Sequence, residues 1–115
     1  MDIKVALASS DGIHVNEHFG RARRFVIYRL RDGQWERLED RENLPACSGQ
    51  EHGDGLLEQT ADLLSDCRGV VVDRIGATAV DVLVSRRILP FMLSGSVAEA
   101  LATLKDSKHF SRTNR

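Results

Sequence analysis

The sequence predicts an α/β protein with a mixed five-stranded sheet and helices packed on its faces. Three observations support this prediction: an Asp32-Gly33 pair between two β-rich runs, alternation of short apolar runs with helical spacing after Gly55, and a capping pattern at Ser96. The first signals an antiparallel hairpin, whereas strands joined through helices run parallel. The 115 residues suit a single domain, which we expect over 1–105, followed by a polar tail over 106–115.

The N-terminal third contains three predicted strands. The run 3–8 is short and rich in β-formers, and it ends in a Ser-Ser-Asp-Gly turn cluster, which is typical of a central strand. The runs 24–30 and 34–39 flank the Asp-Gly turn and should pair antiparallel. Residues 40–54 would then form a connection longer than compact domains usually contain, which indicates a functional role for it.

The remainder alternates helices and strands. Helical spacing begins near Leu56 and should stop near Gly69, and the apolar run 70–72 fits a strand covered on both faces. A second helix is expected over 77–87, a short strand over 88–92, and a third helix after the cap Ser96. This order of elements resembles a ribonuclease-H-like arrangement.

Composition excludes several classes of function. The formal net charge of −1 gives no support for nucleic-acid binding, and no apolar run approaches the roughly 20 residues of a membrane helix. The first residues lack the basic and apolar regions of a signal peptide, so we expect a cytoplasmic protein. The two cysteines, Cys47 and Cys67, should be free thiols.

The loop after the first strand is the main candidate site. It carries His14 and His18, four residues apart, but the preceding Asp-Gly turn does not favour a helix that would align them. The residues alone favour a structural interpretation, with His14 exposed and His18 hydrogen-bonded beside Phe19. A functional interpretation requires further partners.

Possible partners lie elsewhere in the chain. Cys47 and His52 have side chains suited to iron, copper or zinc, but their spacing does not match a structural zinc site, and an exchangeable cofactor fits better. Cys67 is expected to be a buried apolar residue outside the site. Arginines follow the histidine loop, and the loop 73–78 should lie where a strand enters a helix; both could bind an anion. The arginines are Arg21, Arg23 and Arg24.

Several motifs together carry a resemblance to a known family. The sequence resembles the dinitrogenase iron-molybdenum cofactor biosynthesis family, which includes NifX-like carriers and the C-terminal domain of NifB-like proteins. The resemblance covers about residues 3–105. It rests on the run Asp11-Gly12-x-x-Val15-x-x-His18-Phe19-Gly20-x-Ala22, the strand Phe25-x-Ile27-Tyr28, the stretch His52-Gly53-x-Gly55-Leu56 and the turn Ile75-Gly76.

The resemblance implies a role in carriage. The better understood family members bind an iron-sulfur or iron-molybdenum cluster non-covalently on its way to nitrogenase, so the implied partners are cofactor assembly proteins or apo-nitrogenase. The implied contacts are His18 and Cys47 as metal ligands, with Phe19, Gly20 and Arg21 shaping the loop and His52 as a further contact. Many relatives have a glycine-rich turn where this chain has Asp73-Arg74, which changes the shape and charge of that wall.

Two other functions remain as alternatives. The same loops could form a metal-free regulatory module that binds an anion or a protein, with His18 structural. A small phosphodiesterase would need carboxylates for two divalent ions, and the strand ends offer only Ser9, Ser10 and Asp73. We therefore expect a non-catalytic protein, present as a monomer or weak homodimer.

Overall fold

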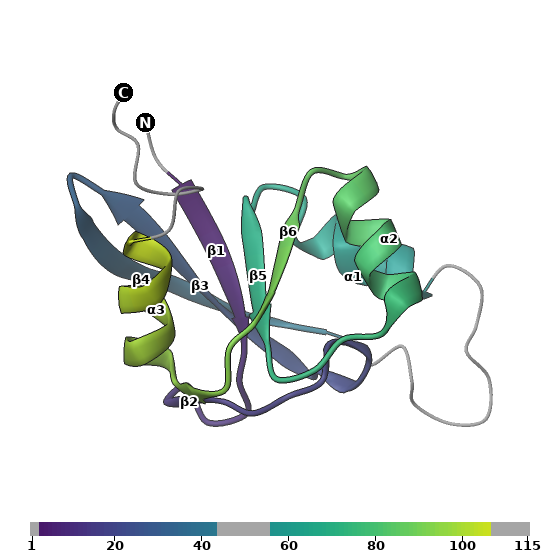
Figure 1. Cartoon of the computed structure of the whole chain (residues 1–115), viewed down its shortest axis with the longest axis horizontal. Coiled ribbons are helices and arrows are strands. Elements are labelled where there is room, and N and C mark those ends of the chain that lie inside the picture. Colours follow the sequence, from purple (N-terminus) through teal and green to yellow (C-terminus); the bar gives the residue numbers. More distant parts are fainter. Residues whose placement is uncertain (1–2, 44–55, 107–115) are drawn as a thin grey trace.

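The computed structural model describes residues 3–43 and 56–106 (Figure 1). Strands and helices alternate after an N-terminal group of strands, as predicted. In chain order the elements are β1 (Ile3–Ala8), β2 (His14–Val15), the 3-10 turn η1 (Phe19–Arg21), β3 (Arg24–Arg31), β4 (Gln34–Glu42), α1 (Leu56–Leu63), β5 (Gly69–Val72), α2 (Ala77–Ser85), β6 (Leu89–Met92), β7 (Gly95–Ser96) and α3 (Val97–Lys105).

Five strands form one mixed sheet in the order β4-β3-β1-β5-β6. β3 pairs antiparallel with both of its neighbours, whereas β1 pairs parallel with β5, and β5 parallel with β6. A single strand, β3, therefore runs against the other four. The predicted mixed sheet with one antiparallel hairpin strand is confirmed, while the ribonuclease-H-like assignment stays a prediction.

The hairpin between β3 and β4 forms at the predicted turn. Asp32 and Gly33 both have positive φ angles, 54° and 79°, as a two-residue type I′ turn requires. β4 continues to Glu42, so the predicted end at residue 39 and the long connection predicted from residue 40 are corrected by three residues. The strand runs on because its pairing with β3 extends to Arg24 opposite Glu42. The rest of that connection, 44–55, lies outside the described residues.

Alternate residues of the sheet point into two separate cores. On β1, Ala6 and Ala8 face α1 and α2, whereas Val5 and Leu7 face α3. Figure 1 shows α1 and α2 together on one face and α3 on the other. The indole Nε1 of Trp35 donates to the carbonyl of Leu101 at 2.8 Å, which ties the hairpin to α3. The sheet is therefore covered on both faces.

The helix termini match the predicted signals in part. Ser96 accepts from the amide of Glu99, and the Glu99 carboxylate accepts from the amide of Ser96, which is a complete capping box. α1 ends at Leu63 rather than near Gly69, because the chain tightens into turns in which the amides of Leu64 and Ser65 bond carbonyls three residues back. Among residues 3–43 and 56–106 no helix has the length and apolar character needed to cross a membrane.

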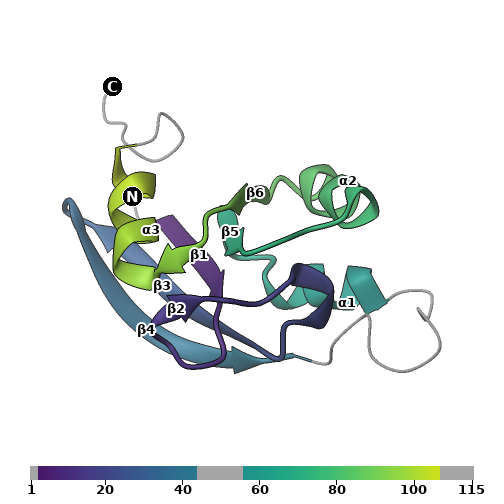
Figure 2. The same cartoon turned by 60° about the horizontal axis from the view of Figure 1, so that its bottom comes forward.

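A second, two-stranded sheet was not predicted. β2 pairs antiparallel with β7, and the amide of Val97 donates to the carbonyl of Ile13 at 2.7 Å. Figure 2 shows these two short strands beside the start of α3. This sheet fastens the loop after β1 to the segment that leads into α3.

Candidate functional site

The first part of the histidine loop is a structural turn centred on Asp11. One carboxylate oxygen accepts from the amides of Ile13 and His14, both at 2.8 Å, and the other lies 2.9 Å from Nδ1 of His14. The contact with the His14 ring, followed by these amide bonds, holds the pKa of the Asp11 carboxyl well below its usual range. Gly12 has a φ of +79° within this turn, a conformation that favours glycine. His14 is thus engaged in building the turn.

The second part of the loop is anchored to the end of β5 by backbone hydrogen bonds. The amide of Asp73 donates to the carbonyl of Glu17 at 2.9 Å, and the amide of Phe19 donates to the carbonyl of Arg74 at 2.8 Å. These bonds place His18 at the carboxyl ends of β1 and β5. In open α/β sheets this is the edge at which ligands bind.

Neighbouring residues of the motif point in opposite directions. The side chain of His18 is 52% exposed, whereas Phe19 is buried and packs against Phe25 with ring centroids 6.0 Å apart. Phe19 therefore fixes the turn in the core, while the imidazole before it faces outward. The sequence expectation that Phe19 shapes the loop is consistent with this position.

A cavity of about 390 Å³ opens next to His18. Two arginines line it, Arg21 from η1 and Arg74 from the loop after β5. The amino end of α2 forms a further wall, and the first turn of a helix presents amide groups that have no partner within the helix. The full lining is His18, Gly20, Arg21, Leu57, Arg74, Ile75, Gly76, Ala77, Thr78 and Ala79.

The charge of this wall favours an anion. Two guanidinium groups and a helix amino terminus converge on the cavity, and both attract negative charge. Among the described residues that line it, His18 supplies an imidazole and none supplies a carboxylate or thiol. Within the described ranges no group of three metal-ligating side chains occurs.

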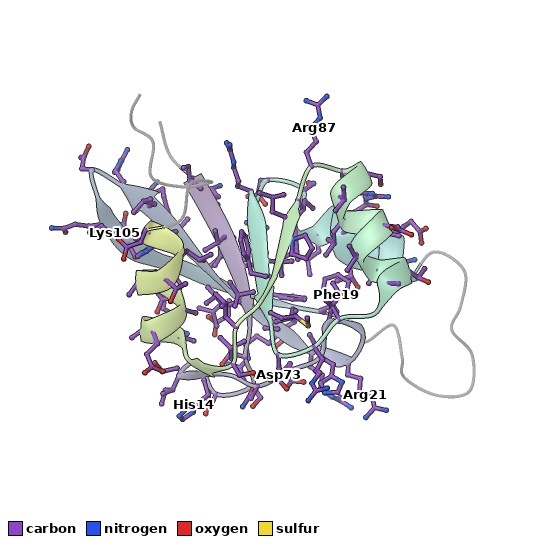
Figure 3. The ribbon with its side chains drawn as sticks, in the orientation of Figure 1. His14, Phe19, Arg21, Asp73, Arg87 and Lys105 are labelled. Atoms are coloured by element: carbon purple, nitrogen blue, oxygen red, sulfur yellow. The ribbon has the colours of Figure 1, made fainter. Side chains whose placement is uncertain are left out.

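Asp73 lies beside the cavity without lining it. Its Oδ2 is 4.0 Å from Nε2 of His18, and its Oδ1 accepts a hydrogen bond from the hydroxyl of Ser94. Figure 3 shows Asp73 on the same edge of the molecule as His14 and Arg21. The sequence interpretation placed Asp73 in a loop that could bind an anion but did not pair it with His18. The sequence feature that could have indicated a role for Asp73 is its position directly after a predicted buried strand.

The other predicted site residues separate into three groups. His18, Gly20 and Arg21 line the cavity, whereas Cys47 and His52 lie outside the described residues. Arg24 has a structural contact instead: its guanidinium donates a hydrogen bond to the backbone carbonyl of Ser10 at 2.9 Å.

Cys67 is buried, as predicted. Its burial raises the pKa of the thiol to about 12. Cys67 belongs to the same hydrophobic core as Leu64 and Val70, as expected of a buried apolar residue.

Fold and site together agree with a family of cofactor-handling proteins. The chain belongs to the dinitrogenase iron-molybdenum cofactor family, whose match covers residues 1–107. The family predicted from the sequence motifs is thereby confirmed.

Relatives include three nitrogen-fixation proteins. The chain is 31% identical over 115 residues to the FeMo cofactor biosynthesis protein NifB of Chlorobaculum tepidum, covering 96% of this chain and 26% of that protein. It is 35% identical over 86 residues to NifY of Klebsiella pneumoniae, covering 74% and 35%. It is 33% identical over 108 residues to NifX of Azotobacter vinelandii, covering 90% and 65%. The chain thus spans about a quarter of NifB and about two thirds of NifX.

Solved structures share the fold. The crystal structure of PH0822 has a TM-score of 0.69 at 24% identity, covering 89% of this chain and 88% of that one. The solution structure of the Thermotoga protein TM1290 has a TM-score of 0.63 at 20% identity, covering 97% of both chains. At these identities the likeness shows the fold alone.

Proposed function

We propose that this protein binds an iron-sulfur or iron-molybdenum cluster in the cavity beside His18 and carries it, without converting it, during metallocofactor assembly for nitrogenase or a similar enzyme. The observation that carries this proposal is the cavity itself, where one exposed imidazole, two arginines and a helix amino terminus converge. The names of NifB, NifX and NifY relatives support the class of cargo.

The chemistry of the wall suits such a cargo. An imidazole such as that of His18 is a good ligand for iron, and guanidinium groups form charge-assisted hydrogen bonds with anionic sulfur or oxygen atoms. Arg21 and Arg74 would balance the negative charge of the cluster. One or two protein ligands in an open loop permit release, which a closed four-ligand cage would hinder. Cys47 as a second metal ligand and His52 as a further contact remain part of this proposal.

Partners follow from the same proposal. A carrier must accept its cargo from a cofactor assembly protein and deliver it to a further assembly protein or to apo-nitrogenase. The exposed position of His18, at the sheet edge rather than within the core, makes its ring accessible to such exchange.

The test is an anaerobic titration with isolated iron-molybdenum cofactor, followed by its visible absorption. His18→Ala should weaken binding by at least about tenfold, because a lost ligand is not replaced by the arginines. His14→Ala is the matched control, because the imidazole of His14 belongs to the same loop but does not line the cavity. Equal binding by wild type and His18→Ala, or no spectral change with wild type, would refute this site.

The arginines also favour a second candidate, a metal-free module that binds an anion or a protein partner. Arg21 and Arg74 could hold such a group with His18 in a structural role. In that case, binding to assembly proteins should survive both chelation and His18→Ala, and should be lost in an Arg21→Gln, Arg74→Gln variant. Pull-down of those proteins, combined with metal analysis of the purified chain, distinguishes the two functions.

A further inference from the structure

We infer that Asp73 is a positioning residue for His18: its carboxylate holds the imidazole through Nε2 and so directs Nδ1 to the cargo. This inference rests on the proposed function for the cavity. It adds a residue from a different part of the chain, directly after β5, to the site.

The backbone brings the two residues together. The hydrogen bonds between Asp73 and Glu17, and between Phe19 and Arg74, lie on either side of the pair and fix the two segments against each other. Oδ2 of Asp73 then lies 4.0 Å from Nε2 of His18. A hydrogen bond needs a separation of about 3 Å, so the two groups are within ion-pair range and the proposed contact requires the imidazole to turn toward the carboxylate.

The carboxylate itself is held in place. The hydroxyl of Ser94, which follows β6, donates to Oδ1 of Asp73, so Oδ2 is the oxygen left toward the ring. The side chain of Asp73 is 30% exposed, compared with 52% for His18. The better-fixed partner is therefore the carboxylate, as expected for a group that orients the other.

The position of Asp73 relative to the cavity completes the argument. His18 lines the cavity and Asp73 does not, so the carboxylate reaches the ring from outside the space that the cargo would fill. Histidines that bind metals commonly donate their other ring N–H to a carboxylate, which fixes the tautomer and raises the basicity of the ligating nitrogen. The pair His18 and Asp73 supplies the imidazole and the carboxylate for such an arrangement, with Nε2 and Oδ2 4.0 Å apart.

Removing the Asp73 carboxylate distinguishes a positioning role from a purely electrostatic effect on the cluster. As a plain negative charge near an anion site, Asp73 would repel the cluster, and Asp73→Asn would tighten binding. As a positioning residue its loss weakens binding, by about 10–100-fold for such partners. The two roles therefore predict changes of opposite sign.

The first experiment is the anaerobic titration with isolated iron-molybdenum cofactor. Asp73→Asn should bind about 10–100-fold more weakly than wild type, and Ser94→Ala should show a smaller loss in the same direction. Adding Asp73→Asn to His18→Ala should cause no further loss, because the carboxylate acts through that ring. Asp81→Asn, which neutralises an exposed carboxylate on α2 outside the cavity lining, is the matched control.

The second experiment needs no cargo. Nitrogen-15 spectra of the histidine rings in the neutral form report which nitrogen carries the proton. In wild type, Nε2 of His18 should be the protonated nitrogen, and Asp73→Asn should increase the share of the Nδ1–H form while His14 stays unchanged. An unchanged His18 tautomer, or cluster binding by Asp73→Asn that is equal or tighter, overturns the inference. Failure of the cavity proposal is distinct, since it appears as wild-type affinity in His18→Ala.

Discussion

Replacing Phe19 tests whether the residue after His18 is an anchor rather than a contact with cargo. Phe19 is buried and lies against Phe25 with centroids 6.0 Å apart. Burial of such a side chain contributes about 1.5–3 kcal/mol, and an aromatic pair adds about 0.5–1.5 kcal/mol. Phe19→Ala should therefore lower the free energy of unfolding by about 3 kcal/mol, within the range of about 3–5 kcal/mol typical of Phe→Ala changes.

Urea unfolding followed by circular dichroism measures this loss. Phe19→Leu, which keeps most of the apolar volume, should lose much less stability and keep the cluster affinity of wild type. His18→Ala, one residue earlier, should leave stability within about 0.5 kcal/mol because its side chain is exposed. A loss below about 1 kcal/mol in Phe19→Ala would refute the assignment of Phe19 as the anchor of the turn.

Three further predictions concern the scaffold. Ser96→Ala removes the side-chain half of the capping box and should cost about 1 kcal/mol in urea unfolding, whereas Ser96→Thr should retain most of it. The carboxylate of Asp66 accepts two hydrogen bonds from the Arg41 guanidinium, at 2.7 and 2.9 Å, and these hold the pKa of Asp66 well below its usual range. The contribution of this ionised carboxylate to folding stability is therefore present above about pH 4 and lost on acidification. Asp66→Asn should flatten the fall in the free energy of unfolding between about pH 5 and 2. A slope equal to that of wild type would contradict this. In a Cys47→Ser background, Cys67 should resist alkylation at pH 8 in the folded protein and react in urea, because burial raises its thiol pKa to about 12.

Local signals in the sequence predicted most of the fold. The Asp32-Gly33 turn needs two positive φ angles and little else, and the Ser96 cap depends on residues within one helical turn. The continuous apolar run at 70–72 indicated a strand covered on both faces, and all of its residues are buried. Such features depend on interactions between residues that are close together in the chain, so they can be predicted from a single sequence.

The site was predicted less completely because its parts meet through tertiary structure. The family resemblance indicated His18, but it did not indicate that the chain returns to β5 and sets this ring beside Asp73 and Arg74. β2 and β7 have two residues each, too short for any periodic pattern. The roles of Cys47 and His52 stay predictions.

The two backbone hydrogen bonds that join the histidine loop to the end of β5 have a consequence for how the family can diversify. Main-chain bonds do not depend on which side chains a segment carries, so the separation of the two cavity walls is independent of residue choice at Arg21, Arg74 or Thr78. Substitutions there can change the charge and shape of the cavity wall while the backbone frame persists.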